Sequence, residues 1–162
     1  MLVVSNTSPI SNLAIIGRLD FLLRRYGTVH IPPEVADELA ALTHPAGSQR
    51  IQTALASHWL KVKSLKHPVT SLTPFRLDPG ETNAIALARE LGADVLLIDE
   101  KRGREAARQL GLTVAGALGE LVHAKFTGWI PNVRDEIYRL RMEARFFVDP
   151  AVEKFILAQV AE

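Results

Sequence analysis

Short aliphatic runs alternate along the chain with segments whose apolar residues recur at helical spacing. The strands that this pattern predicts lie at about residues 2–5, 28–31, 60–64, 94–98 and 112–115. The predicted helices lie at about residues 9–16, 19–26, 33–43, 47–58, 79–91, 101–110, 118–126, 132–145 and 150–161, and the Pro- and Ser-containing stretch 65–78 is predicted to be a loop. Because strands separated by helices are joined by right-handed crossovers, we predict an α/β fold with a mostly parallel sheet covered on both faces.

The chain length of 162 residues is typical of one domain with a sizeable core. We assign residues 1–130 to the α/β domain and residues 131–162 to a C-terminal helical pair. This pair packs either on the same domain or on the partner subunit of a dimer. Three arginines beside Phe146 and Phe147 are compatible with both arrangements.

Composition excludes several classes of protein. With 19 Lys and Arg against 18 Asp and Glu, the net charge of +1 argues against a generally basic nucleic-acid coat. The absence of cysteine excludes disulfides, Cys-ligated zinc and thiol nucleophiles, and is compatible with a reducing cytosol. The N-terminal apolar run is too short for a signal peptide, and the longest strongly apolar stretch in the middle of the chain, 95–98, is too short for a membrane span. We therefore expect a soluble, cytoplasmic protein without membrane contact.

The near-neutral total hides an uneven distribution of charge. The interval between Glu38 and Asp78 contains no acid and carries a formal charge of +5 from Arg50, Lys61, Lys63, Lys66 and Arg76. Asp99 is followed closely by Lys101, Arg102, Arg104 and Arg108. Basic groups of this kind hold a polyphosphate backbone when they flank an acidic pocket, and otherwise they form an ordinary solvated surface.

Four side chains are candidates for a common site. Asn6 follows the first predicted strand and Asp99 follows the strand at 94–98, and ligands of parallel sheets bind at the carboxyl ends of strands. Glu38 and Glu81 lie on adjoining predicted helices. If the four converge, they form a site of oxygen ligands, which favours Mg²⁺ or Mn²⁺ over zinc. Such ions stabilise the attacking and leaving oxygens of phosphodiester cleavage.

Each candidate also has a structural alternative. Asp78 and Glu81 have the spacing of a capping box, a role that is compatible with ligand binding. Glu38 is alternatively a solvated helix residue, Asp99 the N-cap of the helix that follows it, and Asn6 a turn residue bonded to its own backbone. The histidines show no zinc-ligand spacing, and the glycine-rich phosphate loops and the G-x-S-x-G elbow are absent.

Four segments in sequence resemble a PIN domain, and more narrowly its VapC-like subgroup of nucleic-acid-binding proteins. They are VVSNTSPISNLA (3–14), IPPEVADELA (31–40), LDPGETNAIALARE (77–90) and VLLIDEKRGREAARQLGL (95–112), and the resemblance covers about residues 2–125. It implies a three-layer α/β/α sandwich with a central mostly parallel sheet, and a ribonuclease that depends on Mg²⁺ or Mn²⁺. By position, the family's metal-binding acids correspond to Asn6, Glu38, Glu81 and Asp99, of which the three acids are also the expected catalytic residues.

The resemblance also implies substrate contacts and partners. Thr7 and Ser8 match the small hydroxyl positions beside the first acid, and we expect Arg102 and Arg104 to approach RNA phosphates. Many members are toxins of type II toxin–antitoxin pairs, held inactive by a small antitoxin protein, and they are commonly homodimers. The expected partners are therefore an RNA substrate, an antitoxin and a second copy of the chain.

Asn6 departs from the family pattern, because the family usually has Asp at this position. The neutral amide removes a charge close to the expected ion, which weakens electrostatic attraction, and we expect the neighbouring Glu100 to offset part of that loss. The departure supports an alternative from a different class: a catalytically silent PIN-fold module that only binds RNA or a protein.

Overall fold

The computed structural model describes residues 1–67, 69 and 76–162, and these residues contain one parallel sheet in the order β3-β2-β1-β4-β5. Its strands are β1 (Val3–Ser5), β2 (Val29–Ile31), β3 (Leu60–Val62), β4 (Val95–Leu97) and β5 (Val114–Ala115). Each predicted strand is present and is one or two residues shorter than the prediction. Part of the predicted loop 65–78, namely residues 68 and 70–75, lies outside the described residues.

Nine helices occupy most of the remaining described residues. They are α1 (Thr7–Ile15), α2 (Asp20–Tyr26), α3 (Pro33–Ala40), α4 (Pro45–Ala56), α5 (Pro79–Leu91), α6 (Lys101–Gln109), α7 (Ala117–Phe126), α8 (Val133–Glu143) and α9 (Pro150–Gln159). α5 has the predicted bounds because Pro79 suits its first turn and Gly92 ends it in a left-handed conformation. α1 begins at Thr7, two residues before the predicted start at about residue 9, so Asn6 occupies its N-cap position.

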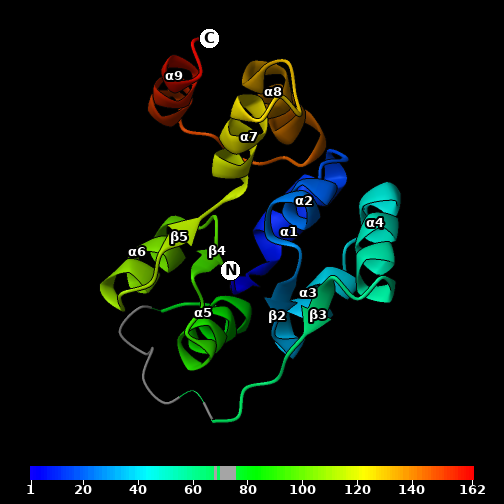
Figure 1. Ribbon diagram of the computed structural model, residues 1–162, viewed down its shortest axis with the longest axis vertical. Helices are drawn as coiled ribbons and strands as arrows, with labels where there is room; N and C mark the ends of the chain where they lie inside the picture. The colour runs from blue at the N-terminus through cyan, green and yellow to red at the C-terminus, as the bar shows by residue number, and fades with distance from the viewer. Residues whose placement is uncertain (68, 70–75) are drawn as a thin grey trace.

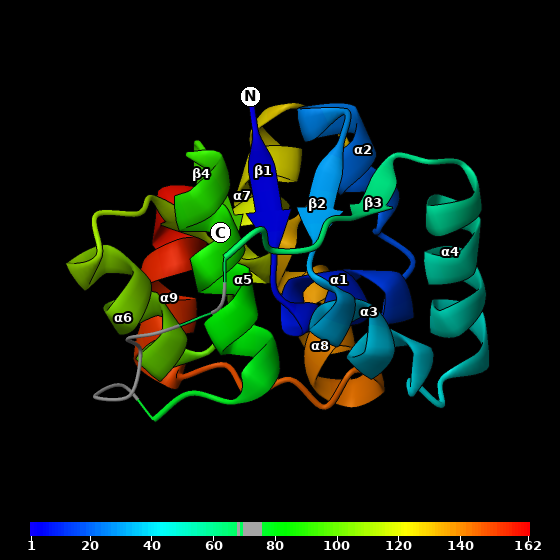
Figure 2. The same cartoon turned by 90° about the horizontal axis from the view of Figure 1, so that it is seen from below.

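The order of the strands separates the helices into two layers. From β1 through β2 to β3 the chain moves toward one edge of the sheet, and from β3 through β4 to β5 it moves back toward the other. Right-handed crossovers then place α1 to α4 on one face and α5 and α6 on the other. α5 contacts β1 and β4, whereas α2 contacts β2 and packs against α7 (Figures 1 and 2). The α/β/α sandwich with a parallel sheet is therefore confirmed.

Both faces of the sheet are apolar, as expected for parallel strands between two helical layers. Val3 and Val4 of β1 are fully buried, and so are Val29 and Ile31 of β2. Leu97 of β4 is equally buried. This central core holds β1 beside β4, so the residues that directly follow these two strands also lie close together.

The C-terminal helices lie at the end of the molecule occupied by α7 (Figure 1). α8 contacts α1 and α7 through a buried stripe of Val133, Ile137 and Leu140. Arg141 of α8 donates a hydrogen bond of 2.5 Å to Glu153 of α9. No helix in the described part of the chain is long and apolar enough to cross a membrane.

Candidate functional site at the carboxyl ends of β1 and β4

The candidate site lies where the direction of the chain through the sheet reverses. β1 and β4 are neighbours, and the helices that follow them go to opposite faces, so their carboxyl ends form the switch point at which parallel sheets bind ligands. We call the region around these two strand ends the opening. Asn6 directly follows β1, and its N–H donates to the carbonyl of Leu97 in β4 at 2.8 Å. Asp99 lies two residues beyond the end of β4. The structure therefore places Asn6 and Asp99 at the same edge of the sheet, on adjacent strands.

Glu38 reaches this edge from α3. Its Oε2 accepts a hydrogen bond of 2.5 Å from the Thr7 hydroxyl, although the side chain is largely exposed. A β-carbon at Gly80, in the first turn of α5, would overlap the Glu38 carboxylate. α5 can approach Glu38 this closely only because residue 80 is glycine. The alternative that Glu38 is only a solvated helix residue is therefore not supported, because Thr7 holds the Glu38 carboxylate beside α5.

Glu81 forms the predicted capping box with Asp78. The Glu81 N–H donates to Asp78 Oδ1 at 2.8 Å, and the Asp78 N–H donates to Glu81 Oε2 at 3.2 Å. Burial, with the side chain 7% exposed, is the main cause that raises the pKa of Glu81. The charge of Asp78 also raises that pKa, the bond from Asp78 lowers it, and Glu100 and Glu38 raise it further. Because capping engages Oε2, the other carboxylate oxygen of Glu81 remains for a ligand.

Asp99 holds the start of α7. Its Oδ1 accepts a hydrogen bond of 2.8 Å from the Ala117 N–H, and its Oδ2 accepts one of 3.3 Å from the Asn12 amide. Burial raises the pKa of Asp99 to about 6, against the lowering effect of these two bonds and of Arg104. The alternative that Asp99 caps the helix following it is wrong, because β4 pairs with β5 and brings Asp99 beside the turn that precedes α7.

Asn6 carries an amide oxygen without a partner. The side chain is 3% exposed, and its buried Oδ1 forms no hydrogen bond with any described residue. The side chain makes no capping bond to α1. The alternative of a turn residue whose amide oxygen bonds its own backbone is therefore not supported. A buried polar atom without a partner is rare and energetically costly, and a water molecule or an ion commonly binds such an atom.

Glu100, Arg102 and Arg104 complete the surroundings. The Ser8 hydroxyl donates to Glu100 Oε1 at 3.1 Å. Arg102 is exposed on α6, whereas Arg104 is half-buried and donates to the carbonyl of Ile98 at 2.9 Å. Of the two predicted phosphate contacts, Arg102 is thus free to extend into solvent, and Arg104 is turned toward the protein.

The donor set suits a hard divalent cation, although the side chains do not form a closed shell. Within residues 1–67, 69 and 76–162, no three His, Asp or Glu side chains are grouped closely enough to hold a metal ion. Mg²⁺ keeps several waters and needs only one or two carboxylates, so a loose set of oxygens is compatible with it. The unpartnered oxygen of Asn6 and the clearance at Gly80 both fit such an ion.

Three glycines and one asparagine that were not predicted from the sequence belong to this region. Gly80, Gly103 and Gly116 lie so close to Glu38, Glu81 and Asp99, respectively, that a β-carbon would crowd or overlap a carboxylate oxygen. Asn12 donates to Asp99 from α1. Glycine within the first turn of a helix is unfavourable without a packing reason, and that signal was available at Gly80 and Gly103.

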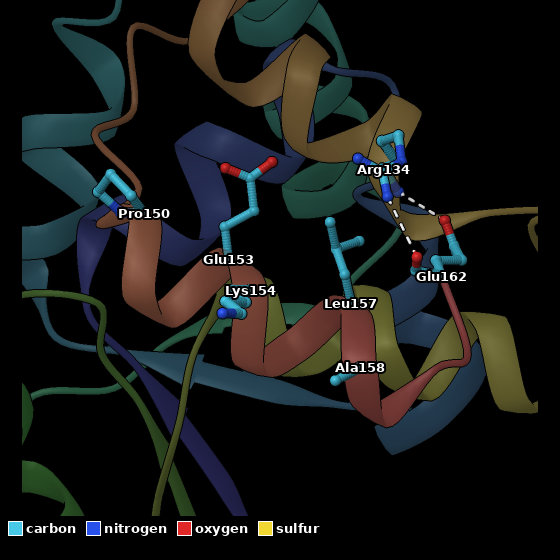
Figure 3. A pocket seen from close by; sticks show the side chains of 7 residues that line it. All are labelled: Arg134, Pro150, Glu153, Lys154, Leu157, Ala158 and Glu162. Atoms are coloured by element: carbon cyan, nitrogen blue, oxygen red, sulfur yellow. Dashed lines mark hydrogen bonds between the residues drawn. The ribbon is translucent and has the colours of Figure 1, made fainter.

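A separate hollow follows α9 and contains none of the predicted site residues. Figure 3 shows Glu153, Leu157 and Glu162 at its lining, with Arg134 bonded to Glu162. Lys154, Pro150 and Ala158 complete the lining. The hollow is therefore distinct from the opening at β1 and β4.

The fold and the site define an α/β protein with an acidic opening at the switch point of a parallel sheet. A family model described as PIN domain matches residues 2–162, and the chain belongs to this family. The resemblance seen in the sequence is confirmed, and the VapC-like subgroup is consistent with it. PIN domains are generally nucleases, which places the chain in a nuclease class at the level of the family.

A solved structure shows the same fold. A PilT N-terminus domain protein from the hyperthermophilic archaeon Sulfolobus solfataricus P2 matches with a TM-score of 0.55 and 21% identity, covering 76% of this chain and 93% of that one. A domain of a functionally unknown protein from Methanocaldococcus jannaschii DSM 2661 matches with a TM-score of 0.46 and 20% identity, covering 70% and 89%. Among curated proteins, none matches this chain significantly.

Proposed function

We propose that this protein is an Mg²⁺- or Mn²⁺-dependent endoribonuclease of the PIN type, acting as the toxin of a type II toxin–antitoxin pair. One observation carries the ribonuclease assignment: acids that form no salt bridge among the described residues surround an opening where the buried amide oxygen of Asn6 also has no hydrogen-bond partner in the described part of the chain. Acids left unpaired in this way are suited to a cation that binds from solution.

Asn6, Glu38, Glu81 and Asp99 would hold the ion. When bound, the ion would stabilise negative charge on the phosphodiester and lower the pKa of water. Thr7 orients the carboxylate of Glu38 through its hydrogen bond, and Ser8 orients that of Glu100. The catalytic acids in this proposal are Glu38, Glu81 and Asp99.

RNA would approach along the exposed side of α6. Arg102 extends into solvent there, one turn from the acids at the start of the helix, and would hold a phosphate of the substrate. Arg104 would act closer to the site, because its guanidinium is held at the carbonyl of Ile98, next to Asp99 in the chain. Thr7 and Ser8 would contact the substrate through their hydroxyls.

A small antitoxin, a homodimeric state and a cytoplasmic location are part of the same proposal and rest on the family resemblance. Exposed aromatic side chains on the C-terminal helices, Tyr138 on α8 and Phe155 on α9, support contact with a second copy. Size-exclusion chromatography with light scattering tests the dimer, and co-purification with the product of an adjacent small gene tests the antitoxin.

The activity is tested by RNA cleavage with Mn²⁺, with and without chelator. We expect Mn²⁺-stimulated cleavage that Asp99→Asn lowers by at least about 100-fold, because the carboxylate is needed while Asn keeps the bond from Ala117. Asp99→Ala should abolish cleavage. Glu105→Gln, an exposed change on α6, is the matched control and should leave the rate unchanged. Cleavage that survives both Asp99 variants would instead belong to a contaminating nuclease.

Asn6 favours one alternative function, a PIN-fold module that binds RNA or a protein without cutting. Calorimetric titration with Mn²⁺ of the wild type and of Asn6→Asp separates the two. Mn²⁺ binding by the wild type argues against the silent module. Binding that appears only in Asn6→Asp, together with RNA binding without cleavage by the wild type, supports it.

A further inference from the structure

The neutral side chain of Asn6 leaves the opening short of one negative charge relative to the family pattern. We propose that Glu100 supplies this charge, from a position that Ser8 fixes. The inference rests on the proposed function, since it concerns the affinity of the same opening for a divalent cation. It assigns a role to a residue outside the four family positions.

The backbone brings Glu100 close to the start of α1. Asn6 is bonded through its N–H to the carbonyl of Leu97, so the residues following β1 and β4 run side by side. Two residues after Asn6, the Ser8 hydroxyl donates to Glu100 Oε1 at 3.1 Å. This bond ties the Glu100 carboxylate to the first turn of α1, directly beyond the position where the charge is missing.

Glu100 is also more available to a cation than Asp99. Both oxygens of Asp99 accept hydrogen bonds, from Ala117 and from Asn12. In the part of the chain that the structure describes, the bond from Ser8 is the one hydrogen bond that the Glu100 carboxylate accepts. Glu100 is exposed, and no salt bridge among the described residues neutralises it.

Glu100 lies next to another acid of the opening. It directly follows Asp99 in the chain, and its carboxylate accepts the bond from Ser8 in the first turn of α1. A cation between these acids would relieve their mutual repulsion. Independently of the acids, the amide oxygen of Asn6 is buried, has no hydrogen-bond partner among the described residues and is suited to the same cation.

The test is a calorimetric titration with Mn²⁺ of the wild type, Glu100→Gln, Asn6→Asp and the double variant, each in the full chain. We expect Glu100→Gln to weaken Mn²⁺ binding by about tenfold or more, because one nearby charge is lost while Gln keeps an oxygen for Ser8. In the Asn6→Asp background the same change should weaken binding less, since the carboxylate at position 6 compensates. Glu105→Gln, on the helix that directly follows Glu100, is the matched control, and the melting temperature without metal should be unchanged in Glu100→Gln and Glu105→Gln.

The outcomes separate this inference from the proposed function. Equal Mn²⁺ affinity of the wild type and Glu100→Gln would overturn the role of Glu100 and leave the metal-dependent nuclease standing. An equal loss in both backgrounds would overturn the compensation for Asn6. Absence of Mn²⁺ binding by the wild type would overturn both proposals, and binding restored by Asn6→Asp alone would show that Glu100 does not compensate.

Discussion

Buried carboxylates occur in two regions of this molecule, and only one region gives them arginine partners. In the helical layer near α8, Glu120 is 1% exposed and accepts hydrogen bonds from Arg25 at 3.1 Å and from the Tyr26 hydroxyl at 2.6 Å. Glu136 is 4% exposed and accepts two bonds from Arg18, at 2.7 and 3.2 Å. The burial of each carboxylate is compensated within the fold.

The opening at β1 and β4 has the opposite character. Among the described residues, no salt bridge involves Glu38, Glu81, Asp99 or Glu100. Burial accordingly raises the pKa of Glu81, and it raises that of Asp99 to about 6. The fold therefore neutralises the acids that support its helices and leaves those at the strand ends to be neutralised by a proton or a bound cation. Perturbed acids in a crevice are typical of functional sites.

Arg18→Met is expected to have the largest effect on stability. Without Arg18, Glu136 keeps only the more distant Arg139, at 3.6 Å, so the free energy of unfolding should fall by about 3 kcal/mol. Urea denaturation at neutral pH measures this loss. The affinity for Mn²⁺ should stay unchanged, because Arg18 belongs to the paired region.

Arg24→Met is the matched control for this change. Arg24 lies over the aromatic ring of Trp129, but both side chains of its ion pair with Asp20 are about half exposed. Its loss should cost only about 0.5 kcal/mol. Similar losses in both variants would contradict the distinction between compensated buried acids and ordinary surface pairs.

The pH dependence of stability tests the unpaired region, with an expected effect of about 2 kcal/mol. The folded protein holds the Asp99 proton up to a pKa of about 6, whereas the unfolded chain loses it near the ordinary aspartate pKa of 3.8. Between these values the folded state binds more protons, so stability falls as the pH rises from about 4 to about 6. Asp99→Asn should remove most of this fall, as urea denaturation across that range with chelator present would measure.

Glu81 contributes a fall in the same direction, because its pKa is also raised. A residual slope in Asp99→Asn is therefore expected. The interpretation of Asp99 as an acid whose charge no salt bridge offsets would be contradicted by wild-type and Asp99→Asn stability profiles that run parallel from pH 4 to pH 7.

The sequence predicts the fold better than the side-chain contacts of the site. Apolar runs and glycine or proline boundaries are local signals, so the order of elements, the bounds of α5 and the Asp78 to Glu81 capping box were all predictable. The proximity of Asn6 and Asp99 followed from a general rule about parallel sheets. It is realised because β4 pairs with β1 across the core.

The partners of the acids depend on contacts between residues far apart in the sequence. Asp99 accepts from Ala117, and this pair forms because β5 lies beside β4 and ends level with it. The bond of Thr7 to Glu38 joins α1 to α3. No local pattern specifies such contacts, which arise from strand order and helix packing. That the Asn6 amide oxygen is buried without a partner among the described residues also depends on the folded packing around it, so the residue type alone does not predict it.

Gly80→Ala tests whether the opening also depends on the close approach of the α5 backbone to Glu38. Its effect on stability should be smaller than that of Arg18→Met or of the change in pH. Alanine favours the helix by about 1 kcal/mol relative to glycine, but its β-carbon would displace the Glu38 carboxylate, so the net change should be below about 1 kcal/mol. The affinity for Mn²⁺ should fall by about tenfold, because Glu38 loses its place beside α5. Gly119→Ala in α7, where a β-carbon meets open space, is the matched control and should raise stability without changing Mn²⁺ binding. If Gly80→Ala binds Mn²⁺ as tightly as Gly119→Ala does, the close approach of α5 to Glu38 at Gly80 serves helix packing and does not contribute to the metal site.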